Sequence, residues 1–239
     1  MAELTQYEMT TGIIIMIVMI LELLLAVMLL VKYVSTKDRR IIYFALFMTF
    51  GAFSFIAITL NFVTILVTGN SIDLLLYLLL AFGFAPLSLI FWMILITELM
   101  YHDKRKIILG IFLVYWIAFR IAFFYILFTD MDSLVTNYWI GGLQVGIFLR
   151  VTMATQLIVI LVTSILFFRE SHKSENKEVR LKGTLFLLGI LILVGSMLMF
   201  SITLNSIFVL IFMIPTILLF WGSLAMPEWV KKNLIKERD

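Results

Sequence analysis

The chain has 239 residues, of which 63% are apolar and 14% are charged, and its mean hydropathy is +1.14. A soluble domain is usually less than about half apolar and about a quarter charged, so lipid rather than water must surround most of this chain. The absence of cysteine excludes disulfides, thiolate metal sites and thiol catalysis.

Seven apolar runs predict seven membrane-spanning helices, because a helix needs about 20 residues to cross about 30 Å of hydrocarbon. The last two runs share one tract, which we divide near Asn205 and Ser206 because it is nearly twice as long as one crossing. A short basic tail, 227–239, follows. The predicted spans are 10–31, 41–67, 74–100, 107–128, 138–168, 183–204 and 206–226.

The basic residues predict how these spans are oriented. Sixteen of the 18 Lys and Arg residues fall in four segments, after the first, third, fifth and seventh runs, whereas the intervening segments hold Glu and Asp but no Lys or Arg. Basic loops stay in the cytoplasm. We therefore expect an all-α, polytopic seven-helix bundle in the plasma membrane, with the N-terminus outside and the C-terminus in the cytoplasm. The lipid bilayer explains this charge pattern without a nucleic-acid partner.

Three charges are predicted to lie at a similar depth inside the membrane: Glu22, Arg120 and Arg150. A charge at the bilayer centre costs roughly 2.5–3.5 kcal/mol, so such residues usually pair or face a cavity. Three interpretations remain open: an ion pair that fixes helix register, an outward-facing site for a small anionic or amphipathic ligand, and a relay that moves charge. Asn61 and Gln144 are predicted to line the ligand site, with Thr59, Thr152, Thr155 and Gln156 as further candidates.

Two prolines and one glycine pair indicate where helices bend or approach each other. Pro86 and Pro215 remove backbone hydrogen bonds and are candidate hinges. Gly142 and Gly146 form a GxxxG pair, which favours close helix contact within the bundle or between protomers of a homo-oligomer. Glu98, near the end of the third span, is predicted to pair with a neighbouring basic loop or to form a latch between helices.

The sequence offers little for catalysis. Its two histidines lie in predicted loops, and it contains no HExxH motif and no glycine-rich phosphate loop. We therefore expect no enzymatic activity, no catalytic residues, no metal site and no cofactor.

Two short segments resemble known seven-span proteins. Ala85-Pro86-Leu87-Ser88-Leu89-Ile90 resembles the proline-containing third helix of microbial rhodopsins. The segment 221–229, WGSLAMPEW, is similar to the exit of the last helix in the seven-span sensor domains of some archaeal and bacterial histidine kinases. The resemblance implies a receptor or sensor whose output needs a separate cytoplasmic protein partner. No predicted span contains a lysine, so a retinal Schiff base is excluded.

Our first functional hypothesis is therefore a receptor-like or sensor protein that relays helix movement from an outward-facing cavity to a cytoplasmic partner. The alternative is an oligomeric ion channel or transporter, and a further alternative is a structural subunit of a membrane complex. Ion flux in liposomes would separate a channel from a receptor.

Overall fold

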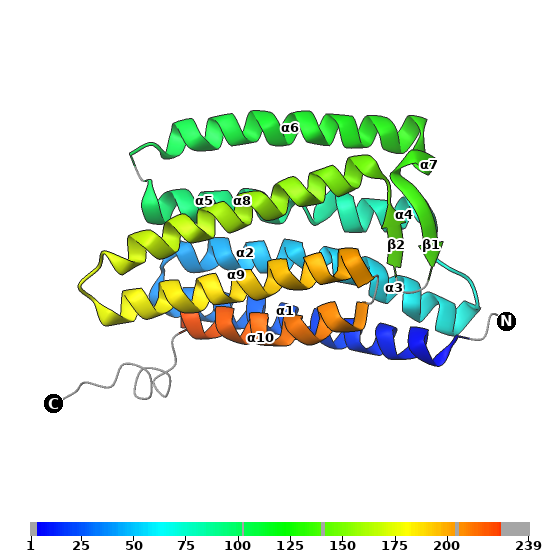
Figure 1. Ribbon diagram of the computed structural model, residues 1–239, viewed down its shortest axis with the longest axis horizontal. Coiled ribbons are helices and arrows are strands. Elements are labelled where there is room, and N and C mark those ends of the chain that lie inside the picture. The colour runs from blue at the N-terminus through cyan, green and yellow to red at the C-terminus, as the bar shows by residue number, and fades with distance from the viewer. Residues whose placement is uncertain (1–3, 102, 140–141, 204–205, 226–239) are drawn as a thin grey trace.

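The structure is a computed structural model that describes residues 4–101, 103–139, 142–203 and 206–225. It shows an elongated bundle of helices that run along one axis, with a short β-hairpin at one end (Figure 1). The elements in chain order are α1 (Gln6–Thr36), α2 (Arg39–Gly51), α3 (Phe53–Thr68), α4 (Leu74–Leu78), the π-helix η1 (Leu79–Phe84), α5 (Leu87–Met100), α6 (Arg105–Thr129), α7 (Met131–Leu134), β1 (Val135–Trp139), β2 (Gly142–Val145), α8 (Ile147–His172), α9 (Lys177–Thr203) and α10 (Ser206–Ala225).

The all-helical class is confirmed, and the helices fit a polytopic membrane protein. Within the described residues, six helical segments are long and apolar enough to cross a bilayer. The described apolar part of α10, Ile211–Ser223, is shorter. The division predicted at Asn205 and the tail 227–239 lie outside the described residues. The six segments are Gln6–Thr36, Arg39–Thr68, Leu74–Met100, Arg105–Thr129, Ile147–His172 and Lys177–Ser196.

Successive spans alternate in direction, so loops of one kind collect at one end (Figure 1). The α1–α2, α5–α6 and α8–α9 loops lie together, and we call this the basic end of the bundle. The α3–α4 loop with Asp73 and the α6–α7 junction with Asp130 lie at the opposite, acidic end. Loops that alternate between basic and acidic along the sequence therefore lie at opposite ends of the bundle.

Local polar groups end and restart the helices at these loops. Lys37 has a positive φ of 56° after α1, and the Asp38 side chain accepts a hydrogen bond from the Arg40 backbone N–H at the start of α2. At the acidic end, Gly69 has φ 75° after α3 and Asp73 caps α4 through the Leu76 N–H. Both turns follow the usual chemistry of helix ends, in which short polar side chains satisfy N–H groups that lack a helical partner.

The fifth span begins later than the predicted 138. Strands β1 and β2 pair antiparallel, so that Tyr138 opposes Leu143 and Trp139 opposes Gly142, and α8 begins at Ile147. Valine, threonine, tyrosine and tryptophan favour strands, which explains the hairpin at the end of an apolar run. The GxxxG prediction is wrong for the same reason, because Gly142 lies in β2 and Gly146 precedes α8.

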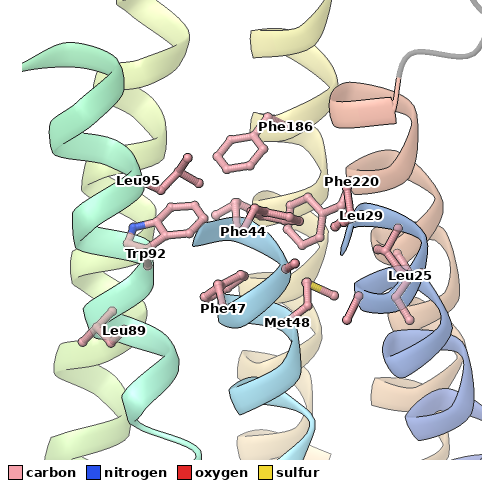
Figure 2. Packing of buried hydrophobic residues seen from close by; sticks show 14 of the residues in the cluster. Leu25, Leu29, Phe44, Phe47, Met48, Leu89, Trp92, Leu95, Phe186 and Phe220 are labelled. Carbon is pink, nitrogen blue, oxygen red and sulfur yellow. The ribbon is translucent and has the colours of Figure 1, made fainter. Parts of the chain in front are cut away.

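Aromatic side chains fill the centre of the tightly packed side of the bundle, between α1, α2, α5, α9 and α10. Trp92 is fully buried, stacks on Phe186 with ring centroids 5.2 Å apart, and lies 5.0 Å from the ring of Phe47. Phe44 of α2 contacts Phe220 of α10 edge-on at 5.6 Å. Figure 2 shows these rings meeting around Phe44, with Leu25 and Leu29 of α1 beyond them.

Candidate functional site

The third span is broken in its middle. The π-helix η1 ends at Phe84, Ala85 and Pro86 follow, and α5 begins at Leu87. Proline has no backbone N–H, so Pro86 cannot donate the helical hydrogen bond to the carbonyl of Phe82, four residues earlier. A break of this kind inside a membrane persists only where neighbouring groups satisfy the released carbonyls.

Arg120 of α6 donates most of the side-chain hydrogen bonds to the carbonyls at this break. Its Nη1 and Nη2 both donate to the Phe82 carbonyl at 2.7 Å, and Nη2 also donates to the Gly83 carbonyl at 2.9 Å. Trp116, one helical turn earlier, donates from Nε1 to the Pro86 carbonyl at 3.2 Å. Two side chains of α6 therefore hold the broken segment in place.

The other neighbours of the Arg120 guanidinium are aromatic rings. Its Cζ lies 5.4 Å from the ring centroid of Trp116, 4.9 Å from that of Phe123 and 5.3 Å from that of Phe124. Such rings attract a cation. Within the described part of the chain no carboxylate pairs with Arg120, so its positive charge is balanced by carbonyl dipoles and ring faces.

A cavity of about 160 Å³ lies against this arginine. It lies between the second span, the broken third span, α6 and α8. Most of its wall is apolar or aromatic, and the guanidinium contributes the charge. The lining residues with polar side chains are Ser54, Ser88, Tyr115, Trp116, Arg120, Thr152 and Gln156.

Glu22 lies behind one wall of this cavity. It is 6% exposed, and its Oε2 has no hydrogen-bond partner among the described residues. Its Oε1 approaches Gly51 so closely that a Cβ built on that glycine would be 3.3 Å away. Since Gly51 also lines the cavity, one glycine separates the buried carboxyl from the space beside Arg120.

The other predicted site residues lie elsewhere. Asn61 is fully buried in α3, and its Oδ1 accepts a hydrogen bond from the Ile72 N–H at 3.0 Å, which stabilises the turn before α4. Gln144 lies in β2, where its carbonyl accepts from Thr136 Oγ1. Arg150 is exposed in the first turn of α8, and its Nε donates to the Val145 carbonyl at 2.7 Å. Ligand binding by these residues stays a prediction, because their positions do not test it.

The two candidate hinges differ in their surroundings. Pro86 lines the cavity beside Arg120, whereas Pro215 lies inside the continuous helix α10. Glu98 pairs with Arg105 at the first residue of α6, as expected for an ion pair with a basic loop. Sequence reasoning missed the π-helix and the carbonyls of Phe82 and Gly83. Pro86, four residues beyond Phe82, was the signal for a released carbonyl, but nothing in the sequence indicated that Arg120 binds it.

The described residues contain no group of three or more His, Cys, Asp or Glu side chains arranged to bind a metal ion. Comparisons with models of protein families, with curated proteins and with solved structures find no match to this chain. The resemblance to microbial rhodopsins and histidine-kinase sensor domains therefore gains no support from a relative, and the candidate site depends on its own geometry.

Proposed function

We propose that this chain is a seven-helix, receptor-like protein of the plasma membrane in which a small anion binds Arg120 and moves the break at Pro86. One observation carries the proposal: the same guanidinium lines the cavity and holds the carbonyls of Phe82 and Gly83. In this proposal α10 is the seventh span, and the basic end faces the cytoplasm because basic loops are retained there.

An anion in the cavity would compete with the two carbonyls for Arg120. A carboxylate or phosphate accepts from a guanidinium more strongly than a neutral carbonyl does, because the hydrogen bonds are charge-assisted. Loss of the arginine would leave the carbonyls of the break unsatisfied and change the angle between η1 and α5. A ligand can shift such an equilibrium only by its difference in affinity for the two states, and Arg120 provides that difference.

The movement would reach the basic end through α5. This helix runs without interruption from Leu87 to Met100, and it packs along α2. Glu98, in its last turn, pairs with Arg105 of α6, so a rotation of α5 strains or breaks this ion pair. A cytoplasmic protein partner that contacts the α5–α6 loop would detect the change.

The size of the cavity limits the ligand. A volume of about 160 Å³ is below the roughly 300–1,000 Å³ that is usual for ligand pockets. A short carboxylate such as propionate is a small ligand that combines one anionic end with a small apolar end. We therefore infer that the ligand is a small anion rather than a long amphipathic one.

Binding is tested on the full chain in nanodiscs of zwitterionic lipid, with propionate as the probe and propionamide as its neutral equivalent. We expect propionate to raise the Tm of the wild type and of Arg150→Gln, and to leave that of Arg120→Gln unchanged. A ligand at 100 times its Kd stabilises a protein by about 2.7 kcal/mol, which is a Tm increase of several degrees for a chain of this length. An equal increase in Arg120→Gln, or with propionamide, would remove Arg120 from the site.

The orientation is tested by cysteine labelling, which is direct because the chain has no cysteine. A membrane-impermeant maleimide should label Ser71→Cys in intact cells, and should label Ser174→Cys only after the cells are opened. Asn233→Cys, in the tail outside the described residues, should behave like Ser174→Cys if α10 crosses the membrane. Labelling of Asn233→Cys from outside would leave six spans and end the seven-helix proposal.

The second candidate is an oligomeric channel or transporter, and the exposure of two spans favours it. In the most apolar stretch of each span, 11% of residues are buried in α6 and 6% in α8. These faces offer room for another copy of the chain. A stable oligomer by native mass spectrometry, together with ion flux in liposomes that Arg120→Gln abolishes, would establish a channel in place of the receptor.

A further inference from the structure

A second cavity lies at the basic end of the bundle. Its volume is about 580 Å³, several times that of the cavity beside Arg120, and within the usual range of roughly 300–1,000 Å³ for ligand pockets. It is bounded by the basic-end parts of α1, α2, α5, α8, α9 and α10. No residue of this cavity lines the cavity beside Arg120.

The inner wall of this cavity is apolar. Leu95 is 1% exposed, Phe186 is 3% exposed and Ile41 is 8% exposed, and all three belong to the aromatic core. Leu99, Met100 and Phe167 extend the same surface. A ligand that reaches this wall must therefore carry an apolar part.

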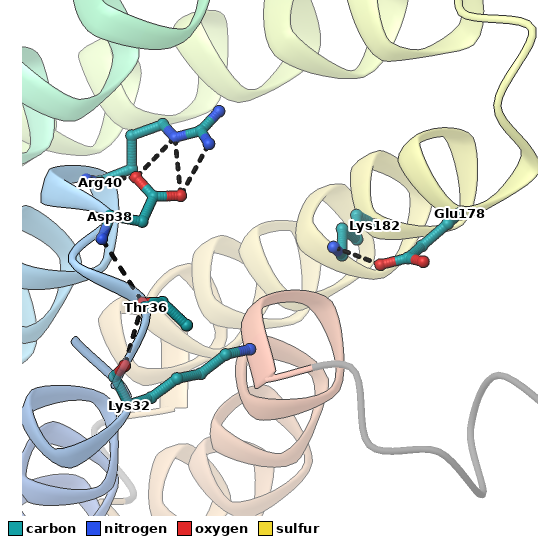
Figure 3. Close-up of polar contacts among 6 residues, drawn as sticks. All are labelled: Lys32, Thr36, Asp38, Arg40, Glu178 and Lys182. Carbon is teal, nitrogen blue, oxygen red and sulfur yellow. Dashed lines mark hydrogen bonds and ion pairs between the residues drawn. The ribbon is translucent and has the colours of Figure 1, made fainter. Parts of the chain in front are cut away.

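The outer wall carries three cations from three different helices: Lys32 of α1, Arg40 of α2 and Lys182 of α9 (Figure 3). Arg40 and Lys182 each form an ion pair. Arg40 donates from Nε and Nη2 to Asp38, with the closest contact at 2.7 Å, and Lys182 lies 2.6 Å from a Glu178 carboxylate oxygen. Within the described part of the chain, Arg40 Nη1 and two of the three N–H donors of Lys182 are left for a further acceptor.

Two carboxylates also line this cavity, and each forms an ion pair. Asp38 pairs with Arg40, one of the three cations of the outer wall, and Glu170 pairs with Lys173 at 2.7 Å. The hydrogen bond from Arg40 holds the pKa of Asp38 below its usual range, and the charge of Lys182 lowers this pKa further. Arg40 and Lys182 therefore both lower the pKa of Asp38, although they come from different helices.

We propose that this cavity binds an amphipathic phosphate, whose anionic group contacts Lys32, Arg40 and Lys182 and whose apolar chain lies against Leu95, Leu99 and Phe186. The position favours this class of ligand, since the basic end of a membrane bundle lies at the depth of lipid headgroups, where each Lys or Arg attracts anionic lipid. The proposal does not depend on the cavity beside Arg120 or on signalling.

The experiment uses the full chain in uncharged detergent and three probes: short-chain phosphatidic acid, phosphatidylcholine with the same chains, and glycerol 3-phosphate. Native mass spectrometry and thermal unfolding measure binding. We expect phosphatidic acid to bind and to raise the Tm, and the other two to bind at least about fivefold more weakly, the contribution of one interfacial basic residue. Equal binding of phosphatidylcholine would show non-specific lipid contact, and equal binding of glycerol 3-phosphate would show a soluble phosphate compound as the ligand. Either result overturns the proposal.

Matched variants on α9 distinguish the effect of a cation in this cavity from the effect of the overall charge of the helix. Glu178→Gln with Lys182→Gln keeps a hydrogen-bonding pair and the net charge but removes the cation from the cavity. Lys177→Gln removes one exposed positive charge from α9 at a position that does not line the cavity. We expect the double variant to bind phosphatidic acid about fivefold more weakly and Lys177→Gln to bind it normally. Normal binding by a folded double variant, judged by an unchanged Tm without probe, would exclude Lys182.

Discussion

The two sides of the bundle are packed very differently. In the most apolar stretches of the spans, 39% of residues are buried in Arg39–Thr68, against 11% in α6 and 6% in α8. The tight side encloses the aromatic core around Phe44 and Trp92. The loose side contributes Arg120, and the π-helical break and the cavity lie where the two sides meet. The difference indicates a rigid frame on one side and a broken segment at its boundary that can move against it.

The two sides differ in the kind of contact that holds them together. Buried rings at 5.0–5.6 Å leave no space for rearrangement, because interiors are close-packed and lose dispersion energy when they open. The break at Pro86 is held by polar contacts from one arginine and one tryptophan, and a competing acceptor can replace them. Segments that move in function are drawn from the less stable parts of a structure.

The largest expected effect is on the aromatic core. Phe44→Ala removes a fully buried ring that contacts Phe47, Phe186 and Phe220. We expect a loss of about 3 kcal/mol in the free energy of unfolding, the lower end of the usual range, because lipid rather than water receives the exposed surface. Phe128→Ala, on α6 and 70% exposed, should change it by less than about 0.5 kcal/mol. Unfolding in mixed micelles measures both, and similar losses would mean that the two sides do not differ.

The second effect is on the approach of α1 to α3. A Cβ at Gly12 would overlap the ring of Phe62, which is 2% exposed and has no room to shift. We expect Gly12→Ala to destabilise the chain by about 1–3 kcal/mol through overpacking. At Gly110 in α6 a Cβ meets no atom within 4 Å, so Gly110→Ala should stabilise the chain by up to about 1 kcal/mol through helix propensity. Opposite signs in the same unfolding assay support the comparison, and equal signs contradict it.

The sequence was enough to predict the helical membrane class and the separation of charge between the two ends, because both follow from composition and length. The ion pair of Glu98 with the α5–α6 loop also followed from neighbouring positions along the chain. Depth along a helix was less predictable. Arg150 was placed at the level of Arg120 by counting residues, but strands β1 and β2 precede α8 and leave Arg150 in its first turn.

Which groups face each other across the bundle was beyond the sequence, because that depends on how helices rotate when they pack. Nothing in the pattern places Glu22 against Gly51, or Arg120 against the carbonyls of Phe82 and Gly83. Sequence reasoning looked for acidic partners for the arginine and overlooked backbone carbonyls. The Phe82 carbonyl is available as an acceptor because Pro86 has no N–H to donate to it. The proline and the arginine therefore belong to one structural feature.

The third expected effect distinguishes Pro86, at the break, from Pro215, inside α10. Pro86→Ala restores an N–H that can bond to the Phe82 carbonyl and compete with Arg120. We expect amide hydrogen exchange at residues 82–88 to slow by about fivefold, since one backbone hydrogen bond contributes about 1 kcal/mol. Pro215→Ala, in α10 on the tight side, should leave the exchange at 82–88 unchanged. Faster exchange in Pro86→Ala would show that the break itself stabilises this segment.

The smallest effect is at the basic end, where Asp38 connects α1 to α2. The hydrogen bond from Arg40 lowers the pKa of Asp38, so the stabilisation is complete above the unfolded-state pKa of about 3.9 and is lost as the pH falls through the lower folded-state value. At pH 7 we expect Asp38→Asn to be less stable by up to about 1 kcal/mol, the usual range for a partly exposed ion pair. Asparagine can still cap α2, so this difference reports the charge.

The difference between the wild type and Asp38→Asn should shrink as the pH falls below about 3.9, because both side chains are then neutral. Asp73→Asn is the matched control at the acidic end: Asp73 caps α4 in the same way, but no ion pair holds it among the described residues. Thermal unfolding between pH 2.5 and pH 7 measures all three chains. A difference between the wild type and Asp38→Asn that persists at low pH would assign the effect to the cap rather than to the ion pair.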